Sequence, residues 1–89
     1  MRWCREASVL WRRNGDRILL LPSGAEEALL LEGVSAALWE ALASPARTDE
    51  LVEPLAEVFD GAPERIEADL VAFLEQLHGR GVLNVTQVA

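Results

Sequence analysis

The chain has 89 residues, about half of them apolar, which suits one small folded domain and excludes a disordered segment. It carries 15 acidic residues, eight arginines and no lysine, and its acidic C-terminal half opposes nucleic acid binding, because contacts to phosphates supply most of that affinity. No apolar run is long enough to span a membrane, the N-terminus lacks the apolar core of a signal peptide, and Cys4 is the only cysteine, so we expect a cytoplasmic protein without disulfides.

The first predicted element is a β-hairpin. Residues 9–13 and 16–21 are strand-like, and Asn14-Gly15 between them is a strong hairpin signal, because both residues tolerate the positive φ angles of a type I′ turn. The second of these strands is apolar on both faces, which suits a central position in a sheet.

A third strand is predicted over residues 26–32, between the turn signals Ser23-Gly24 and Gly33. Its inner residues, 28–31, are apolar without a break, which is typical of a strand buried on both faces or of a piece of buried helix. The simplest strand order is sequential, with this strand at the edge of the sheet. An apolar strand with an open edge invites pairing with another chain unless something covers it.

Two predicted helices follow. An apolar stripe at helical spacing predicts the first over residues 34–43, ended by Ser44-Pro45. Thr48 is a good N-cap for the second helix, and Asp60-Gly61 is expected to close it. Pro54 requires that this second helix either kinks or begins late.

The third predicted helix has the clearest apolar stripe in the chain. Pro63 fits its first position, and Gly79 or Gly81 is expected to end it. Residues 82–85 then form a short strand-like tail, and residues 86–89 are expected to fray.

The predicted architecture is α+β and winged helix-turn-helix-like. An N-terminal three-stranded antiparallel sheet is followed by three helices and a short wing strand. We expect a single domain over residues 1–89, with a core from about residue 8 to residue 85.

The residues indicate no catalytic, metal or cofactor site. His78 is the only histidine, and it lies in the last turn of the third helix, where a cation complements the helix dipole. One histidine and one cysteine cannot build an ordinary zinc site, and there is no glycine-rich phosphate loop. Glu26-Glu27 suits edge charges that resist aggregation better than acid–base chemistry. We therefore expect a binding protein rather than an enzyme.

A winged helix-turn-helix outline also raises DNA binding, in which the third helix would enter the major groove. That helix region carries four acidic residues against Arg65 and Arg80, a balance that repels phosphates. We expect no nucleic acid partner.

Four stretches carry a family resemblance. A leucine-rich strand runs into an Ala-Ala-aliphatic-Trp helix over residues 29–42, and a second, threonine-capped helix begins within residues 47–51. The third helix has the pattern Asp-aliphatic-x-x-Phe-Leu-x-x-Leu over residues 69–77, followed by Gly81-Val82-Leu83. In this order and spacing, over roughly residues 9–85, they resemble the PqqD-like family, the RiPP recognition elements, which serve ribosomally made and post-translationally modified peptides.

The resemblance implies that the domain binds the leader segment of a precursor peptide as an extra antiparallel strand on residues 26–32, in a groove shared with the third helix. A separate maturation enzyme, such as a protease, cyclase or radical enzyme, would then act on the peptide. The residues expected to contact the peptide are Glu27, Ala28, Leu29, Leu30, Leu31, Arg65, Asp69, Leu70 and Phe73. Leu70 and Phe73 suit core packing equally well, and it stays open which side-chain face of the strand meets the groove.

Two other functions stay open. The edge of the third strand could pair with a second copy of the chain, which would make it a structural or dimerisation module. The chain could also be an acidic winged-helix regulator that contacts protein rather than DNA. The sequence leaves open which precursor is bound and which enzyme is served.

Overall fold

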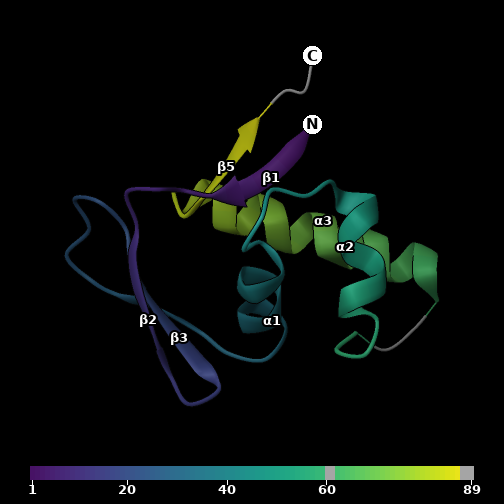
Figure 1. Ribbon diagram of the computed structural model, residues 1–89, viewed down its shortest axis with the longest axis horizontal. Helices are drawn as coiled ribbons and strands as arrows, with labels where there is room; N and C mark the ends of the chain where they lie inside the picture. The colour runs from purple at the N-terminus through teal and green to yellow at the C-terminus, as the bar shows by residue number, and fades with distance from the viewer. Residues whose placement is uncertain (60–61, 87–89) are drawn as a thin grey trace.

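The computed structural model describes residues 1–59 and 62–86. In chain order its elements are β1 (Arg2–Arg5), β2 (Leu10–Asn14), β3 (Arg17–Leu21), β4 (Leu29–Leu31), α1 (Val34–Ala41), α2 (Thr48–Leu55), α3 (Pro63–Gly79) and β5 (Leu83–Thr86) (Figure 1). Strands β2, β3 and β4 form an antiparallel sheet in sequential order. The predicted α+β architecture and strand order are therefore confirmed.

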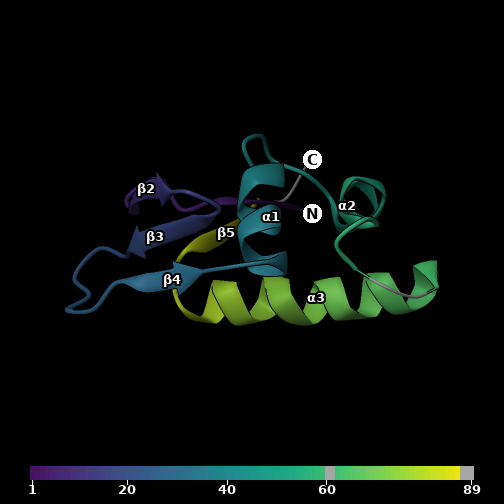
Figure 2. The same cartoon turned by 90° about the horizontal axis from the view of Figure 1, so that it is seen from below.

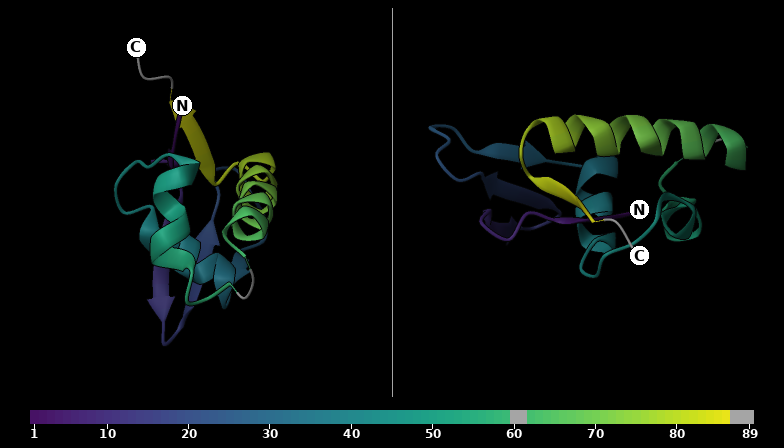
Figure 3. Two further views of the ribbon diagram at one scale, coloured as in Figure 1. Left: turned by 90° about the vertical axis from the view of Figure 1, so that its right-hand side faces the viewer. Right: turned by 90° about the horizontal axis from the view of Figure 1, so that it is seen from above.

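A second sheet, formed by β1 and β5, goes beyond the predicted architecture. The two strands are antiparallel and lie side by side near the chain termini (Figures 1 and 3), with Trp3 opposite Val85. Trp3 is only 5% exposed, so the folded core begins before residue 8. β5 is the predicted wing strand, and it includes Thr86, which is paired with Arg2 rather than frayed; residues 87–89 lie outside the described part of the chain.

The turn between β2 and β3 differs from the predicted type I′ turn. Asn14 is the last residue of β2 and pairs with Arg17, so the two-residue loop is Gly15-Asp16. Gly15 has φ of 68°, and no residue other than glycine has a positive φ in residues 1–59 and 62–86. A glycine with positive φ at the first loop position is the pattern of a type II′ turn, which suits the twist of a hairpin equally well.

Helix α2 accommodates Pro54 without a late start. The helix begins at Thr48, one residue after the cap residue Arg47, whose backbone N–H donates to Glu50 Oε1 at 2.9 Å. Pro54 is the second-last residue, so the helix ends at Leu55, soon after the proline interrupts its bonding pattern. The predicted closing residues, Asp60-Gly61, lie outside the described part of the chain.

Helix α3 begins at Pro63 as predicted and ends with a Schellman motif. Gly81 has φ of 79°, its N–H donates to the His78 carbonyl at 3.0 Å, and the Val82 N–H donates to the Leu77 carbonyl at 3.3 Å. Gly81 is therefore the residue that ends the helix and turns the chain into β5.

One buried cluster links the three-stranded sheet to the helices. The indole ring of Trp39 on α1 is fully buried and meets Trp11 of β2 edge to face, with 5.8 Å between ring centroids. Arg5 lies 4.8 Å from both ring centroids, and its Nε and Nη2 donate to the Trp39 carbonyl at 3.0 and 2.7 Å. Burial lowers the pKa of Arg5, a shift that nearby Glu40 opposes. Arg5 thus adds two bonds to a carbonyl in the last turn of α1, which also accepts the Leu42 N–H at 3.2 Å, and links β2 to that helix through Trp11.

The described residues contain neither a membrane-spanning helix nor a cluster of metal-binding side chains. None of their helices is long and apolar enough to cross a membrane. No group of three or more histidine, cysteine, aspartate or glutamate residues among them is placed to hold a metal ion.

Candidate functional site

The sheet has two edge strands among the described residues, β2 and β4, and β4 is the one that lies beside α3 (Figure 2). β4 pairs on one side with β3, through Ile18↔Leu31, Leu19↔Leu30 and Leu20↔Leu29, and in the described part of the chain no strand pairs with its other side. β4 is also shorter than the predicted strand over residues 26–32. An open edge next to a folded core is a ready template for another strand.

The three leucines of β4 are not buried alike, so the expectation of burial on both faces is wrong. Leu31 is 2% exposed, Leu29 is half-buried and Leu30 is 45% exposed. Leu31 belongs to the same buried cluster as Ile18 and Leu20, on the face that α1 covers. The opposite face has no helix over it, so alternate side chains of β4 stay exposed. The sheet therefore places Leu29 and Leu31 toward the helices and Leu30 away from them.

The register also shows which backbone groups of β4 are directed to the open edge. Asn14 and Arg17 flank a two-residue loop, so they form a pair that exchanges both ladder bonds. Because such pairs alternate along antiparallel strands, Leu29 and Leu31 direct their N–H and C=O groups to β3. The N–H and C=O of Leu30 consequently point to the open edge.

The chain itself closes one end of this edge. The Glu32 N–H donates to Ser35 Oγ at 3.2 Å, and the Ser35 hydroxyl donates to the Glu32 carbonyl at 2.8 Å. Glu32 would be the next residue after Leu30 to face an added strand, but both of its backbone groups already have a partner. The available edge is therefore centred on Leu30.

A hollow of about 190 Å³ lies between β4 and the C-terminal half of α3. A second, larger hollow of about 490 Å³ continues along α3 and shares Phe73 and Gln76 with the first. We call the two together the β4–α3 groove; Figure 2 shows β4 running beside the C-terminal half of α3, in the opposite direction. The residues that line the groove are Leu29, Leu30, Leu31, Ser35, Asp69, Ala72, Phe73, Glu75, Gln76, Leu77 and Arg80.

Charge is distributed unevenly along the β4–α3 groove. Arg80, at the end of α3, is the only charged residue that lines the hollow beside β4. Asp69 and Glu75 line the other hollow, which contains no cation. The three side chains form none of the ion pairs found among the described residues, so their charges are available to a ligand.

The structure brings some of the predicted contact residues together and separates others. Five of them line the groove: Leu29, Leu30, Leu31, Asp69 and Phe73.

The remaining four predicted residues lie elsewhere. Glu27 and Ala28 precede β4, and Ala28 lines a different hollow on the helix-free face of the sheet. Arg65 is exposed on α3 but does not line the groove. Leu70 is fully buried in the core, so its side chain is not available to a peptide.

Sequence reasoning missed six groove residues, Ser35, Ala72, Glu75, Gln76, Leu77 and Arg80. Three of these had a signal: Gln76, Leu77 and Arg80 follow Phe73 by three, four and seven positions, the spacing of neighbours on one helix face. Ser35 had no such signal, because its position depends on how the chain turns between β4 and α1.

Comparisons with known proteins identify the family of the chain. The family model for coenzyme PQQ synthesis protein D (PqqD) matches residues 17–83. The PqqA binding protein of Rhizobium meliloti (strain 1021) is 30% identical over 74 residues, which span 83% of this chain and 72% of that protein. A solved structure, TbiB1 in complex with the TbiA(beta) leader peptide, matches with a TM-score of 0.80 at 21% identity and covers 96% of this chain and 99% of that one. The predicted family resemblance is confirmed, and the chain belongs to the PqqD family.

Proposed function

We propose that this domain binds the leader segment of a ribosomally made precursor peptide by strand addition to β4. It would present that peptide to a separate modifying enzyme, such as a protease, cyclase or radical enzyme, and would catalyse no step itself. Membership of the PqqD family, a relative named for binding PqqA, and a fold shared with a domain solved with a leader peptide support this proposal.

The open edge at Leu30 is the observation that carries the proposal. An added strand would receive one ladder bond from the Leu30 N–H and donate another to its carbonyl, which gives affinity without regard to peptide sequence. Alternate peptide side chains would then face the same side as Leu29 and Leu31, toward Phe73 and Leu77. Those side chains would supply the specificity.

The charges of the groove favour a particular order of basic and acidic residues along the bound peptide. A strand antiparallel to β4 runs in the same direction as α3, because β4 and α3 are antiparallel (Figure 2). Its N-terminal part would lie beside Asp69 and Glu75, and its C-terminal part beside Arg80. We therefore expect leaders with basic residues before the apolar segment and an acidic residue after it.

The groove residues suit binding better than catalysis. Neither hollow is lined by a cysteine or a histidine. The single hydroxyl in the groove, that of Ser35, is bonded to the Glu32 backbone, and among the described residues it has no hydrogen bond to a side chain that could act as a base.

Titration of the domain with the fluorescently labelled leader of the precursor encoded beside its gene tests the proposal. We expect binding at micromolar concentrations, and Leu30→Arg should weaken it at least tenfold by placing a charge at the docking edge. Val58→Arg is the matched control, because Val58 is also an exposed apolar residue but does not line the groove. Absence of binding at tens of micromolar, for every neighbouring precursor, would refute the proposal.

A second copy of the chain is the competing occupant of the β4 edge. Light scattering over a range of protein concentrations distinguishes the two occupants. We expect a monomer, or a weak dimer that dissociates when the leader is added. A stable dimer that is unaffected by the leader and is lost in Leu30→Arg would assign the edge to self-association instead.

A further inference from the structure

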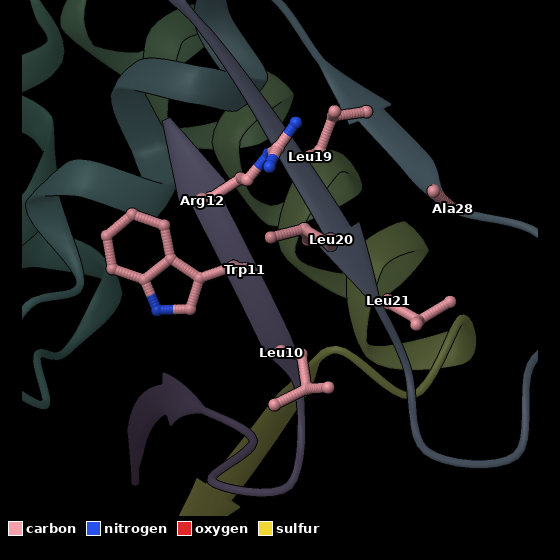
Figure 4. Close-up of a pocket in the computed structure, with 7 residues that line it drawn as sticks. All are labelled: Leu10, Trp11, Arg12, Leu19, Leu20, Leu21 and Ala28. Atoms are coloured by element: carbon pink, nitrogen blue, oxygen red, sulfur yellow. The ribbon is translucent and has the colours of Figure 1, made fainter. Parts of the chain in front are cut away.

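The helix-free face of the three-stranded sheet carries leucines that the core does not use. Leu10 is 70% exposed and Leu21 is 39% exposed, and by strand alternation they share this face with Leu19 and Leu30. Leu10, Leu19 and Leu21 surround a hollow of about 210 Å³ together with Ala28 and Arg12 (Figure 4), and we call it the leucine hollow; Trp11 and Leu20 complete its lining. It lies on the opposite side of the sheet from the β4–α3 groove.

Ala28 makes this hollow continuous with the open edge. It lies two residues before Leu30 and lines the hollow with Leu19 and Leu21 of β3. Figure 4 shows its short side chain at the side of the hollow where the chain enters β4. A strand added beside β4 would therefore have only a methyl group between it and the leucines of β3.

We infer that the leader peptide carries an aromatic side chain that crosses Ala28 and fills the leucine hollow. This inference rests on the proposed strand addition. The peptide residues opposite Leu30 and Ala28 have their side chains on the same face as those two residues. Adjacent strands are about 4.8 Å apart, so an added strand would lie about 9.6 Å from β3, and its side chain must extend over β4 to meet the side chains of Leu19 and Leu21. Long and aromatic side chains have that reach, and short ones do not.

Two properties of the hollow favour one aromatic side chain as its occupant. Its volume is smaller than the roughly 300–1,000 Å³ of a typical small-molecule site, so it suits a single side chain. Arg12 is the only charged residue that lines it, and Arg12 is absent from the ion pairs formed by the described residues. A free guanidinium stacks well on an aromatic face.

Side chains of the leader would therefore contact the domain on both faces of the sheet. Some of its side chains would enter the β4–α3 groove, and an alternate one, paired with the stretch before Leu30, would enter the leucine hollow. This second contact gives a reason for the exposed leucines, which the contacts in the β4–α3 groove do not explain.

An alanine scan of the leader against three forms of the domain tests the inference. The probe is the labelled leader encoded beside the gene, with single alanine replacements, and the domains are wild type, Ala28→Leu and Ala28→Ser. Ala28→Leu places the domain's own side chain in the path to the hollow, whereas Ala28→Ser keeps that path open. Ala28 is exposed and has a negative φ, so both variants should fold, which thermal melting checks.

The expected result is one aromatic leader position whose replacement weakens binding to wild type and to Ala28→Ser by about fivefold to tenfold. The same replacement should weaken binding to Ala28→Leu less than twofold. If every aromatic replacement has the same effect on all three domains, the inference is overturned, although strand addition still stands because the leader binds. If the leader binds none of the three domains, the inference and the proposed function fail together.

Discussion

Leu30 allows the proposed ladder bond to be removed without disturbing the folded domain. Its N–H points to the open edge, whereas those of Leu29 and Leu31 are directed to β3, so proline at position 30 removes no bond within the sheet. Proline is tolerated on edge strands where the N–H side faces solvent. Leu30→Pro should therefore remain folded and lose one donor to the leader.

The size of the effect follows from the hydrogen bond that is lost. A net contribution of about 0.5–1.5 kcal/mol per bond corresponds to about a twofold to twelvefold change in Kd. Leu30→Ala is the matched control, since it loses the same exposed side chain but keeps the N–H. The leader should bind Leu30→Pro more weakly than Leu30→Ala by that factor, and somewhat more if the proline ring also obstructs the added strand.

Fluorescence anisotropy with the labelled leader measures both affinities, and thermal melting shows whether each variant is folded. Leu29→Pro is expected to destabilise the domain strongly, because the Leu29 N–H belongs to the β3 ladder and its side chain packs against the core. Equal affinity of folded Leu30→Pro and Leu30→Ala would refute strand addition at this residue.

Three further variants test the groove and the fold. Phe73→Ala should weaken leader binding at least tenfold and leave a folded domain, because Phe73 is half-buried in the groove. Leu70→Ala should instead lower the free energy of unfolding by about 2–5 kcal/mol, because Leu70 is fully buried. A lower melting temperature for Phe73→Ala than for Leu70→Ala would contradict this division. Gly81→Ala should lower the free energy of unfolding by about 1–2 kcal/mol, because alanine is strained at a φ of 79°. Urea denaturation measures this, and an unchanged denaturation midpoint would contradict the Schellman motif at the end of α3. Arg5→Lys should lower the free energy of unfolding by about 1–2 kcal/mol, because lysine cannot reproduce the two bonds to the Trp39 carbonyl. A variant as stable as the wild type would show that this contact contributes little to stability.

Local signals in the sequence predicted most of the fold. Turn residues and apolar stripes placed the hairpin, the edge strand and three helices, because these depend on neighbours within a few positions. β1 was missed because its partner, β5, is about eighty residues away, and four residues such as Arg2–Arg5 carry no pattern of their own. The turn was shifted by one residue because Asn14-Gly15 and Gly15-Asp16 both form hairpin loops.

The candidate site was predictable only in part. Three consecutive leucines in β4 have no polar–apolar alternation, so the sequence could not show that Leu30 faces away from the helices. The apolar stripe of α3 is also wider than the surface that the core covers. Packing against the core buries Leu70 and leaves Phe73 at the groove, a division that depends on how α3 crosses the sheet.

Amide hydrogen exchange at Leu30, with and without bound leader, tests the central claim most directly. In the free domain the Leu29 and Leu31 amides should already be protected by β3, while the Leu30 amide exchanges quickly. Strand addition predicts that the leader slows exchange at Leu30 and changes its two neighbours little. Fast exchange at Leu30 under saturating leader would contradict a peptide strand on β4.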